Sequence, residues 1–321
     1  MSIPATEVVP LPAGQTPYIT ANMLLDGSWP TGVSFLSIPP QRTAVDQQKY
    51  AAVSSIAAQA TSDCDAYCNQ PLRCTLTTEV FHGPGDYRVN IQNGSRLCRV
   101  ILQRLPILAI TQVQVAPNAG FPRQFTTVPA NFWEPEYPAL GLYNSIAPSA
   151  GGQGGQAILI APGYVNWCLG RFGWVIQVTY THGWPHSSLT AQASAAATSI
   201  SVDDCTGWAV TTAAGTGAAG VIYDGGQQEA VRVTASSVTQ GPGTLTLAAP
   251  LQFAHAAGVM VSSFPQNIIW AAALFSAATA LTRGATATTI QDAPGHFGGG
   301  RGPEDLANEA EVKLHPYRRT V

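Results

Sequence analysis

The chain has 321 residues, of which 10% are charged and 45% are hydrophobic, and its formal net charge at pH 7 is −3. A chain of this length can bury a full core and is expected to hold two domains. Globular domains usually carry about 25% charged residues, so a surface this poor in charge favours a protein that is partly covered in an obligate assembly. The slightly acidic balance excludes the basic field with which proteins grip nucleic acid.

We expect neither a targeting segment nor a membrane span. The first residues, Met-Ser-Ile-Pro-Ala-Thr-Glu, lack the basic and apolar regions of a signal peptide. The longest apolar run, residues 268–281, is shorter than the ~20 residues that a membrane span requires. The chain should therefore be soluble and made in the cytoplasm, with its six cysteines reduced and packed as small hydrophobic side chains.

The first part of the chain is expected to be an extended arm followed by two helices. Residues 1–19 are rich in proline and show no periodicity. Thr20 can cap a short helix that Gly27 ends, and Thr43 gives a capping-box-like start to a longer helix that ends at Asn69-Gln70-Pro71. The packable positions of the longer helix trace one face, and they are Val45, Lys49 (through its aliphatic stem), Val53, Ile56, Ala60, Cys64 and Tyr67.

Strands are expected through the middle of the chain, interrupted by a loop rich in Pro, Phe and Trp over residues 117–155. The strand-like runs lie over residues 74–81, 99–102, 107–115, 157–161 and 174–181.

The block over residues 187–263 contains short strand-like runs separated by turn residues, which indicates a separate β module. Two strand-like runs, Val221–Tyr223 and Glu229–Val233, flank Asp224-Gly-Gly, which is a strong hairpin signal. With further strands over residues 199–202, 243–247 and 259–261, the block should form a small barrel-like sheet.

Pro265 suits the first turn of a helix that is apolar on two faces. Such a helix must be enclosed, either by its own domain or by neighbouring subunits. We predict subunit-interface roles for its large apolar residues, which are Ile268, Trp270, Leu274, Phe275 and Leu281. Residues 285–302 are expected to form a flexible Gly-rich linker, and Pro303 to start a last short helix.

These elements predict an α+β fold, with a helical core of long helices and a few strands and with an inserted small β-barrel-like domain. The expected organisation is an arm over residues 1–19, a discontinuous core over 20–186 and 264–284, the inserted β domain over 187–263, and a linker and tail over 285–321.

Motifs typical of cofactor binding lack their structural context. Gly215–Gly220 matches the dinucleotide fingerprint literally, but a strand and an Asp-Gly turn follow it instead of a helix N-terminus. His182 and His186 have metal-like spacing, but Trp184-Pro185 between them excludes a regular helix. We therefore expect both histidines to lie in the turn, where they bond to the backbone or pack on Trp184.

Possible metal ligands and paired carboxylates also have simpler interpretations. Cys64 and Cys68 would share a helix face and Cys74 and Cys98 are possible further ligands, yet no pair has zinc-knuckle spacing. The pairs Asp203-Asp204 and Asp224/Glu229 lie at strand–turn boundaries, where such side chains commonly shape the turn. We predict no catalytic activity, no cofactor and no metal.

Several features, taken in order, resemble the head-tail connector (adaptor) proteins of long-tailed bacteriophages. They are a short helix near Tyr18, a long helix ending in Tyr67-Cys-Asn-Gln-Pro-Leu72, Glu79 in the next strand, Pro106-Ile-Leu, Tyr180-Thr-His-Gly-Trp-Pro185, the hairpin with Asp224, Gly225 and Glu229, and the ending Pro316-Tyr-Arg-Arg319. The inserted β module departs from the smallest family members, so its role is not carried over.

The resemblance implies a structural virion protein at the head-tail junction (the neck) of the particle. Such a protein forms a homo-oligomeric ring, of twelve copies, beneath the portal protein and presents a docking surface to the stopper or tail proteins. DNA would pass through its channel without specific binding, which suits an acidic chain. In similar adaptors the C-terminal segment engages the portal, which implies portal-binding roles for Leu306, Val312, Leu314, Tyr317, Arg318 and Arg319.

Two alternatives remain open. The first is another tail or capsid-decorating protein with a glycan-binding β module, for which Trp133, Tyr137, Trp167 and Trp184 are possible sugar platforms. The second is a hydrolase that uses Asp203, Asp204 or His182. Aromatic side chains gathered on one exposed face would favour the first, and a deep pocket with convergent carboxylates the second.

Overall fold

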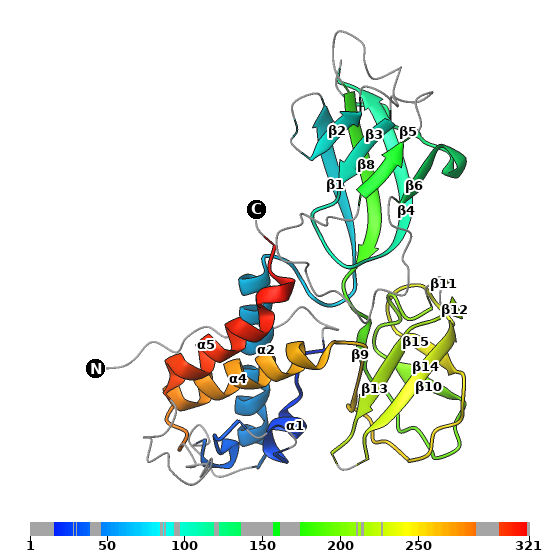
Figure 1. The fold of residues 1–321 in the computed structure, drawn as a ribbon. Coiled ribbons are helices and arrows are strands. Elements are labelled where there is room, and N and C mark those ends of the chain that lie inside the picture. Colours follow the sequence, from blue (N-terminus) through cyan, green and yellow to red (C-terminus); the bar gives the residue numbers. More distant parts are fainter. Residues whose placement is uncertain are drawn as a thin grey trace. The chain divides into compact units, whose positions relative to one another are not determined.

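The structure is a computed structural model of the whole chain. It describes residues 16–27, 29, 31–38, 46–83, 86, 88–92, 97–118, 122–135, 157–160, 174–209, 211–212, 215–225, 227–286 and 302–319. The chain divides into two compact units (Figure 1). The first unit comprises Met1–Leu72, Pro185–Ala209 and Ala218–Val321, and the second comprises Arg73–Trp184 and Val210–Gly217.

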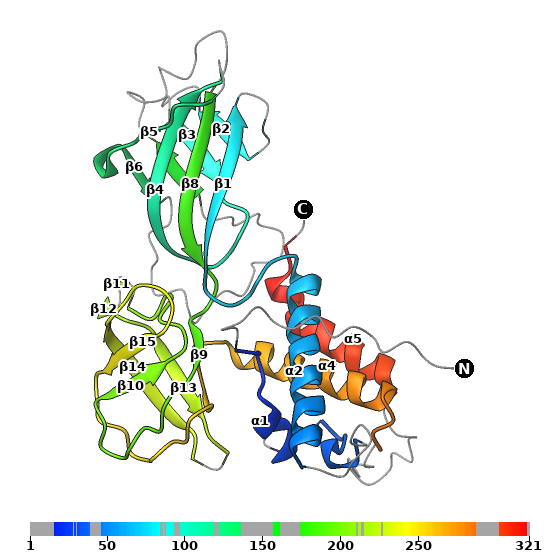
Figure 2. The same cartoon turned by 180° about the vertical axis from the view of Figure 1, so that it is seen from behind.

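The first unit contains all the described α-helices and two 3-10 turns. They are α1 (Ala21–Leu25), η1 (Phe35–Ser37, a 3-10 turn), α2 (Asp46–Cys68), α4 (Gln266–Thr282), α5 (Pro303–Leu314) and η4 (His315–Tyr317, a 3-10 turn). Helix α4 packs against both α2 and α5 (Figures 1 and 2). Its residues are almost all apolar or small, and most are buried, because the chain's own helices enclose them. The predicted cap of α1 by Thr20 is confirmed. Pro265 was expected in the first turn of α4 and lies just before that turn, as the N-cap.

The first unit also contains a six-stranded antiparallel sheet. Its strands are β9 (His186–Ser188), β10 (Ser199–Val202), β13 (Ala219–Tyr223), β14 (Glu229–Ser236), β15 (Gly243–Leu247) and β16 (Met260–Ser262), in the order β10-β15-β14-β13-β16-β9. Beyond β9, Leu189 bridges to Val202 of β10, so the sheet curls back toward its first strand around a core that includes the fully buried Trp208. The predicted hairpin across Asp224 is confirmed, with Ile222 opposite Glu229.

The second unit consists of two four-stranded sheets and a short ribbon. One sheet has the order β1-β8-β4-β5, and its strands are β1 (Thr75–Gly83), β4 (Ile107–Pro117), β5 (Thr126–Thr127) and β8 (Trp174–His182). The other has the order β2-β3-β7-β6, with β2 (Val89–Gln92), β3 (Leu97–Ile101), β6 (Trp133–Pro135), which follows η2 (Ala130–Phe132), and β7 (Ala157–Ile160). The ribbon pairs β11 (Thr211–Thr212) with β12 (Gly215–Thr216).

The core of the second unit is a layer of apolar side chains from both of its sheets, including Phe81, Val100, Ile160, Ile176 and Val178. Gly83 lies against the ring of the buried Trp174, and a Cβ at that glycine would come within 2.6 Å of the ring. The close approach of β1 to this tryptophan therefore requires glycine.

The predicted fold class is wrong, because the described chain is mainly β-sheet. We expected a core of long helices with a few strands, but residues 73–184 form a unit made of sheets, separate from the helices. The physical reason is that strands of this region pair over long sequence separations, such as β1 with β8, and local patterns do not contain that information.

The six-stranded sheet and the helices lie in one compact unit, while the expected core range of residues 20–186 is divided after Leu72. No described helix is both long enough and apolar enough to cross a membrane.

Candidate functional site

The end of α2 and the end of the chain lie together in the first unit. Asn69 donates from Nδ2 to the carbonyl of Arg319 at 2.9 Å, and Gln70 donates from Nε2 to the carbonyl of Tyr317 at 3.1 Å. The Arg319 amide donates back to the carbonyl of Cys68 at 3.0 Å. The two segments are about 250 residues apart in sequence, and both belong to the features that resemble phage adaptors. Their contact fixes the C-terminal segment to the first unit.

Beside this contact lies a surface hollow of about 390 Å³. Tyr67 borders it from α2, and the guanidinium of Arg318 lies 5.2 Å from the centre of the Tyr67 ring. Val312 borders it from α5 and is 73% exposed, the largest exposure among the described large apolar side chains. The other lining residues are Asn308, Glu311, His315 and Pro316. An exposed apolar side chain next to a hollow is typical of a docking surface.

The predicted portal-binding residues fall into two groups. Leu306 and Leu314 are fully buried, because α5 packs on α4 within the same chain. Val312 and Arg318 are exposed, and Tyr317 and Arg319 are half-buried. Only the second group can reach a partner while α5 keeps this packing.

The predicted subunit-interface residues of α4 are largely enclosed by the chain itself. Ile268, Leu274 and Phe275 are buried, while Trp270 and Leu281 are half-buried. The ring of Trp270 packs against Trp29 at 5.4 Å between centroids. The sequence allowed this helix to be enclosed either by its own domain or by neighbouring subunits. In the structure, most of its residues are buried by its own domain.

A second set of residues from the resemblance meets in the second unit. The Tyr180 hydroxyl donates to Glu79 Oε1 at 2.5 Å and accepts from the Arg104 amide at 3.1 Å. The other oxygen of Glu79 accepts from the Gln103 amide at 3.2 Å. Burial, and then the neighbouring Glu79, raise the pKa of Tyr180, so its hydroxyl keeps its proton. The group holds the turn before β4 against β1 and β8.

His182 is buried in the same sheet. Its Nε2 lies 3.0 Å from the Thr77 hydroxyl, and its Nδ1 has no hydrogen-bond partner among the described residues. Burial, with a smaller effect of Arg104, lowers its pKa to about 3, so the ring is neutral at ordinary pH. His186 lies in the first unit, where its Nδ1 is 3.0 Å from the Ser262 hydroxyl. The two histidines therefore belong to different contacts.

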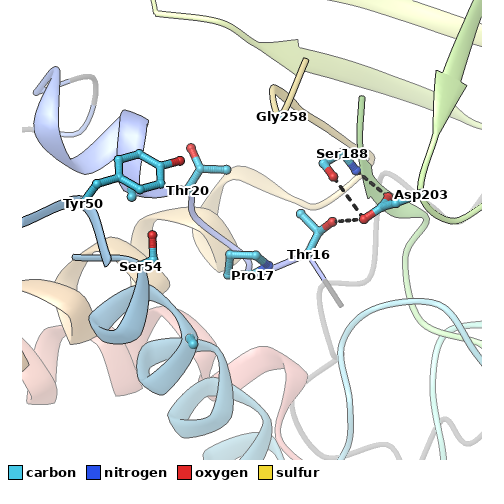
Figure 3. Close-up of a pocket in the computed structure, with 10 residues that line it drawn as sticks. Thr16, Pro17, Thr20, Tyr50, Ser54, Ser188, Asp203 and Gly258 are labelled. Atoms are coloured by element: carbon cyan, nitrogen blue, oxygen red, sulfur yellow. Dashed lines mark hydrogen bonds between the residues drawn. The ribbon is translucent and has the colours of Figure 1, made fainter. Parts of the chain in front are cut away.

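The carboxylates that the hydrolase alternative requires are used separately. Figure 3 shows Asp203 beside an open hollow of about 380 Å³, where it accepts from the Thr16 hydroxyl and from the amide and hydroxyl of Ser188. Asp204 Oδ1 accepts from the Thr206 amide at 2.9 Å and from the Gly241 amide at 3.1 Å. Neither arrangement gives the convergent carboxylates of an acid–base pair.

A strap formed by residues 16–20 crosses this part of the first unit. Its Pro17 carbonyl accepts from His186 Nε2 at 3.0 Å, and its Tyr18 hydroxyl donates to Asp65 Oδ1 of α2 at 2.5 Å. The Leu72 amide donates to the same hydroxyl at 3.0 Å. The strap thus joins β9 to the end of α2, a contact that the proline-rich sequence did not reveal.

The remaining candidates also have structural environments. Cys64 and Cys68 are buried, and burial followed by Asp65 raises the pKa of Cys64 and raises that of Cys68 to about 12, so both thiols keep their protons at neutral pH. In the described part of the chain, no three His, Cys, Asp or Glu side chains are grouped as metal ligands. Trp184 is buried and Trp133 is half-buried on the second unit's core. Cys98 has no described side chain, and Tyr137, Trp167 and Cys168 lie outside the described residues.

His255 is a site residue that the sequence did not indicate. Its fully buried ring lies between two carboxylates, with Nδ1 3.0 Å from Asp224 Oδ2 and Nε2 3.3 Å from Glu229 Oε2. Glu229 also accepts from the amides of Gln252 and Phe253, at 2.7 and 3.3 Å. The pair Asp224/Glu229, considered above for catalysis or calcium, therefore holds a histidine and a loop in place.

We expect the stability of the first unit to depend on Glu229 in acid. Burial alone would raise the pKa of Glu229, but the amides of Gln252 and Phe253 and the ring of His255 outweigh burial and hold the pKa below its usual 4.5. A carboxylate with a lowered folded-state pKa stabilises the fold above its unfolded pKa, and this stabilisation is lost as the pH falls through the folded value. The difference in melting temperature between wild type and Glu229→Gln should therefore be constant near neutral pH and shrink below pH 4.5. A difference that stayed constant into strong acid would contradict the assignment.

Comparisons of the chain with protein-family models, with curated proteins and with solved structures give no match.

Proposed function

We propose that this chain is a structural subunit of the neck of a long-tailed bacteriophage, one copy in a ring that lies beneath the portal and continues the DNA channel. The observation that carries the proposal is the contact between the segment Tyr67–Leu72 and the chain end Pro316–Arg319. These are two of the features that resemble adaptors, they are far apart in sequence, and they bond to each other. The two sequence segments that resemble adaptors therefore form one structural feature in this chain.

The chemistry of the described sites supports a role without turnover. The polar side chains of these sites accept hydrogen bonds from backbone amides or hydroxyl groups of the chain itself. They are Glu79, Tyr180, Asp203, Asp204 and Glu229. A net charge of −3 suits a channel wall along which DNA slides without adhering, because phosphate contacts would oppose passage.

The ring can be tested by measuring mass and shape. The purified protein would be studied by light scattering and by electron-microscope class averages, alone and with the portal protein encoded in the same genome. We expect ring-shaped averages with a mass many times the 33.6 kDa of one chain. A protein that stayed monomeric with the portal, and did not bind it, would refute the proposal.

For portal contact we propose the exposed part of the C-terminal surface, that is Val312 and Arg318. Val312→Asp should weaken binding to the portal by about tenfold or more, as expected when an apolar anchor becomes charged. Its melting temperature should not change, because the side chain is 73% exposed. Leu36→Asp is the matched control, since Leu36 is 64% exposed and lies elsewhere in the first unit. Equal portal affinity of the two variants would exclude this surface.

A further inference from the structure

Strand β1 is an edge of its sheet. Among the described residues its only hydrogen-bonded neighbour is β8 (Figure 2). Hydrogen bonds from the following turn show which backbone groups face the open side. The amide and carbonyl of His82 bond to Asp86, and the carbonyl of Val80 accepts from the Arg88 guanidinium at 3.5 Å. Because these groups alternate along a strand, the backbone groups of Leu76 and Thr78 also face outward.

The turn covers one end of this edge and leaves the other end open. Asp86 and Arg88 form an ion pair at 2.8 Å beside His82 and Val80. Charged groups at a strand edge are a common protection against pairing with another chain. No described residue gives similar cover to Leu76 and Thr78, so the open part of the edge runs from Leu76 to the amide of Val80.

The open edge is complementary to itself. Leu76 and Val80 are exposed large apolar side chains, at 42% and 37%, and both lie on the outer face of the sheet, two positions on either side of Thr78. In an antiparallel pairing centred on Thr78, each Leu76 lies opposite Val80 of the other copy. The flanking outward residues of β8 are Gln177, Thr179 and Thr181, which carry no charge, so two copies of this face do not repel each other.

We propose that two copies of this chain pair through the open edge of β1, antiparallel and about a two-fold axis at Thr78. The pairing adds apolar contact between Leu76 and Val80 in both symmetry-related positions and extends the sheet across the two chains. A two-fold contact of this kind uses the same surface on both copies, whereas a ring uses two different surfaces. The dimer therefore goes beyond the proposed neck function, and either can hold without the other.

A cysteine cross-link tests the axis directly. Residues directly opposite in a hydrogen-bonded antiparallel pair have Cα atoms about 5.5 Å apart, a distance that a disulfide spans. Thr78→Cys should thus give an intermolecular disulfide on mild oxidation, beyond any seen for wild type. Thr179→Cys is the matched control on the next strand, where the two copies would be about 14 Å apart, three strand spacings. Equal cross-linking of both variants, or none at position 78, would overturn the proposal.

A charge exchange tests the register even if a cysteine variant is unstable. Leu76→Glu and Val80→Lys should each weaken the dimer by roughly tenfold in sedimentation equilibrium, since each change acts at two positions. The double variant places Glu opposite Lys of the other copy and should recover association at low salt. Val238→Lys, at a position 41% exposed in the first unit, should have no effect. A monomeric wild type, single variants that pair normally, or a double variant that does not recover would each overturn the pairing.

Discussion

Glu229→Ala is expected to destabilise the first unit by about 3–5 kcal/mol, because it removes the hydrogen-bond partner of several buried polar groups at once, each of which costs about 1–3 kcal/mol when left unsatisfied. The His255 ring is fully buried and bonds to Glu229 on one side and Asp224 on the other. Alanine would also leave the amides of Gln252 and Phe253 without their acceptor. Chemical denaturation monitored by far-ultraviolet circular dichroism measures the loss.

Two variants separate this effect from a general loss of charge. Glu304→Ala removes an exposed carboxylate at the start of α5 and should leave stability within about 0.5 kcal/mol of wild type. Glu229→Gln keeps an acceptor oxygen for only one of the two amides, because they bond to different oxygens of the carboxylate, and it should fall between wild type and alanine. A loss below about 1 kcal/mol for Glu229→Ala would mean that solvent reaches His255 and replaces the carboxylate.

Tyr18→Ala is expected to have an effect of similar size, about 3–5 kcal/mol, as for other large buried aromatic residues. The Tyr18 ring is fully buried and meets the rings of His186 and Phe264 edge-on, at 5.7 and 4.7 Å between centroids. Its hydroxyl bonds to Asp65. One side chain thus secures the strap, β9 and the end of α2.

The matched control is Tyr50→Ala, because Tyr50 is 45% exposed on the same helix that Tyr18 contacts. Tyr18→Phe isolates the hydroxyl and should cost only about 1 kcal/mol, since the Leu72 amide still donates to Asp65 at 2.9 Å. If Tyr18→Ala were no more harmful than Tyr50→Ala in thermal unfolding, the strap would not hold these elements together.

The sequence predicted those features that depend on a few neighbouring residues. Thr20 caps α1, Asp224 lies in the turn between β13 and β14, and Pro265 directly precedes α4, because each effect is decided within one turn of chain. The balance of helix and sheet was predicted wrongly, since it depends on which strands pair. The partner of Thr75 in β1 is His182, and nothing near either residue indicates this.

The candidate sites show the same limit. The apolar pattern of the C-terminal segment was visible, but only packing on α4 decides that Leu306 and Leu314 are buried while Val312 is exposed. The contact of Thr16 with Asp203 joins residues 187 positions apart and has no local signal. His255 lay in an inconspicuous run, because its importance comes from two carboxylates on another hairpin.

The two ends of the stretch that forms most of the second unit lie next to each other. Arg73 bridges to Trp184, and the Cys74 amide donates to the Trp184 carbonyl at 2.8 Å. The chain thus leaves the first unit after Leu72 and re-enters it at Pro185, and the residues at these two points are hydrogen-bonded neighbours. Residues inserted or removed between these two points need not change the distance between Leu72 and Pro185, where the chain leaves and re-enters the first unit. Loops of this stretch can therefore grow or shrink during evolution, or receive a fused tag, without altering the register of α2 or α4.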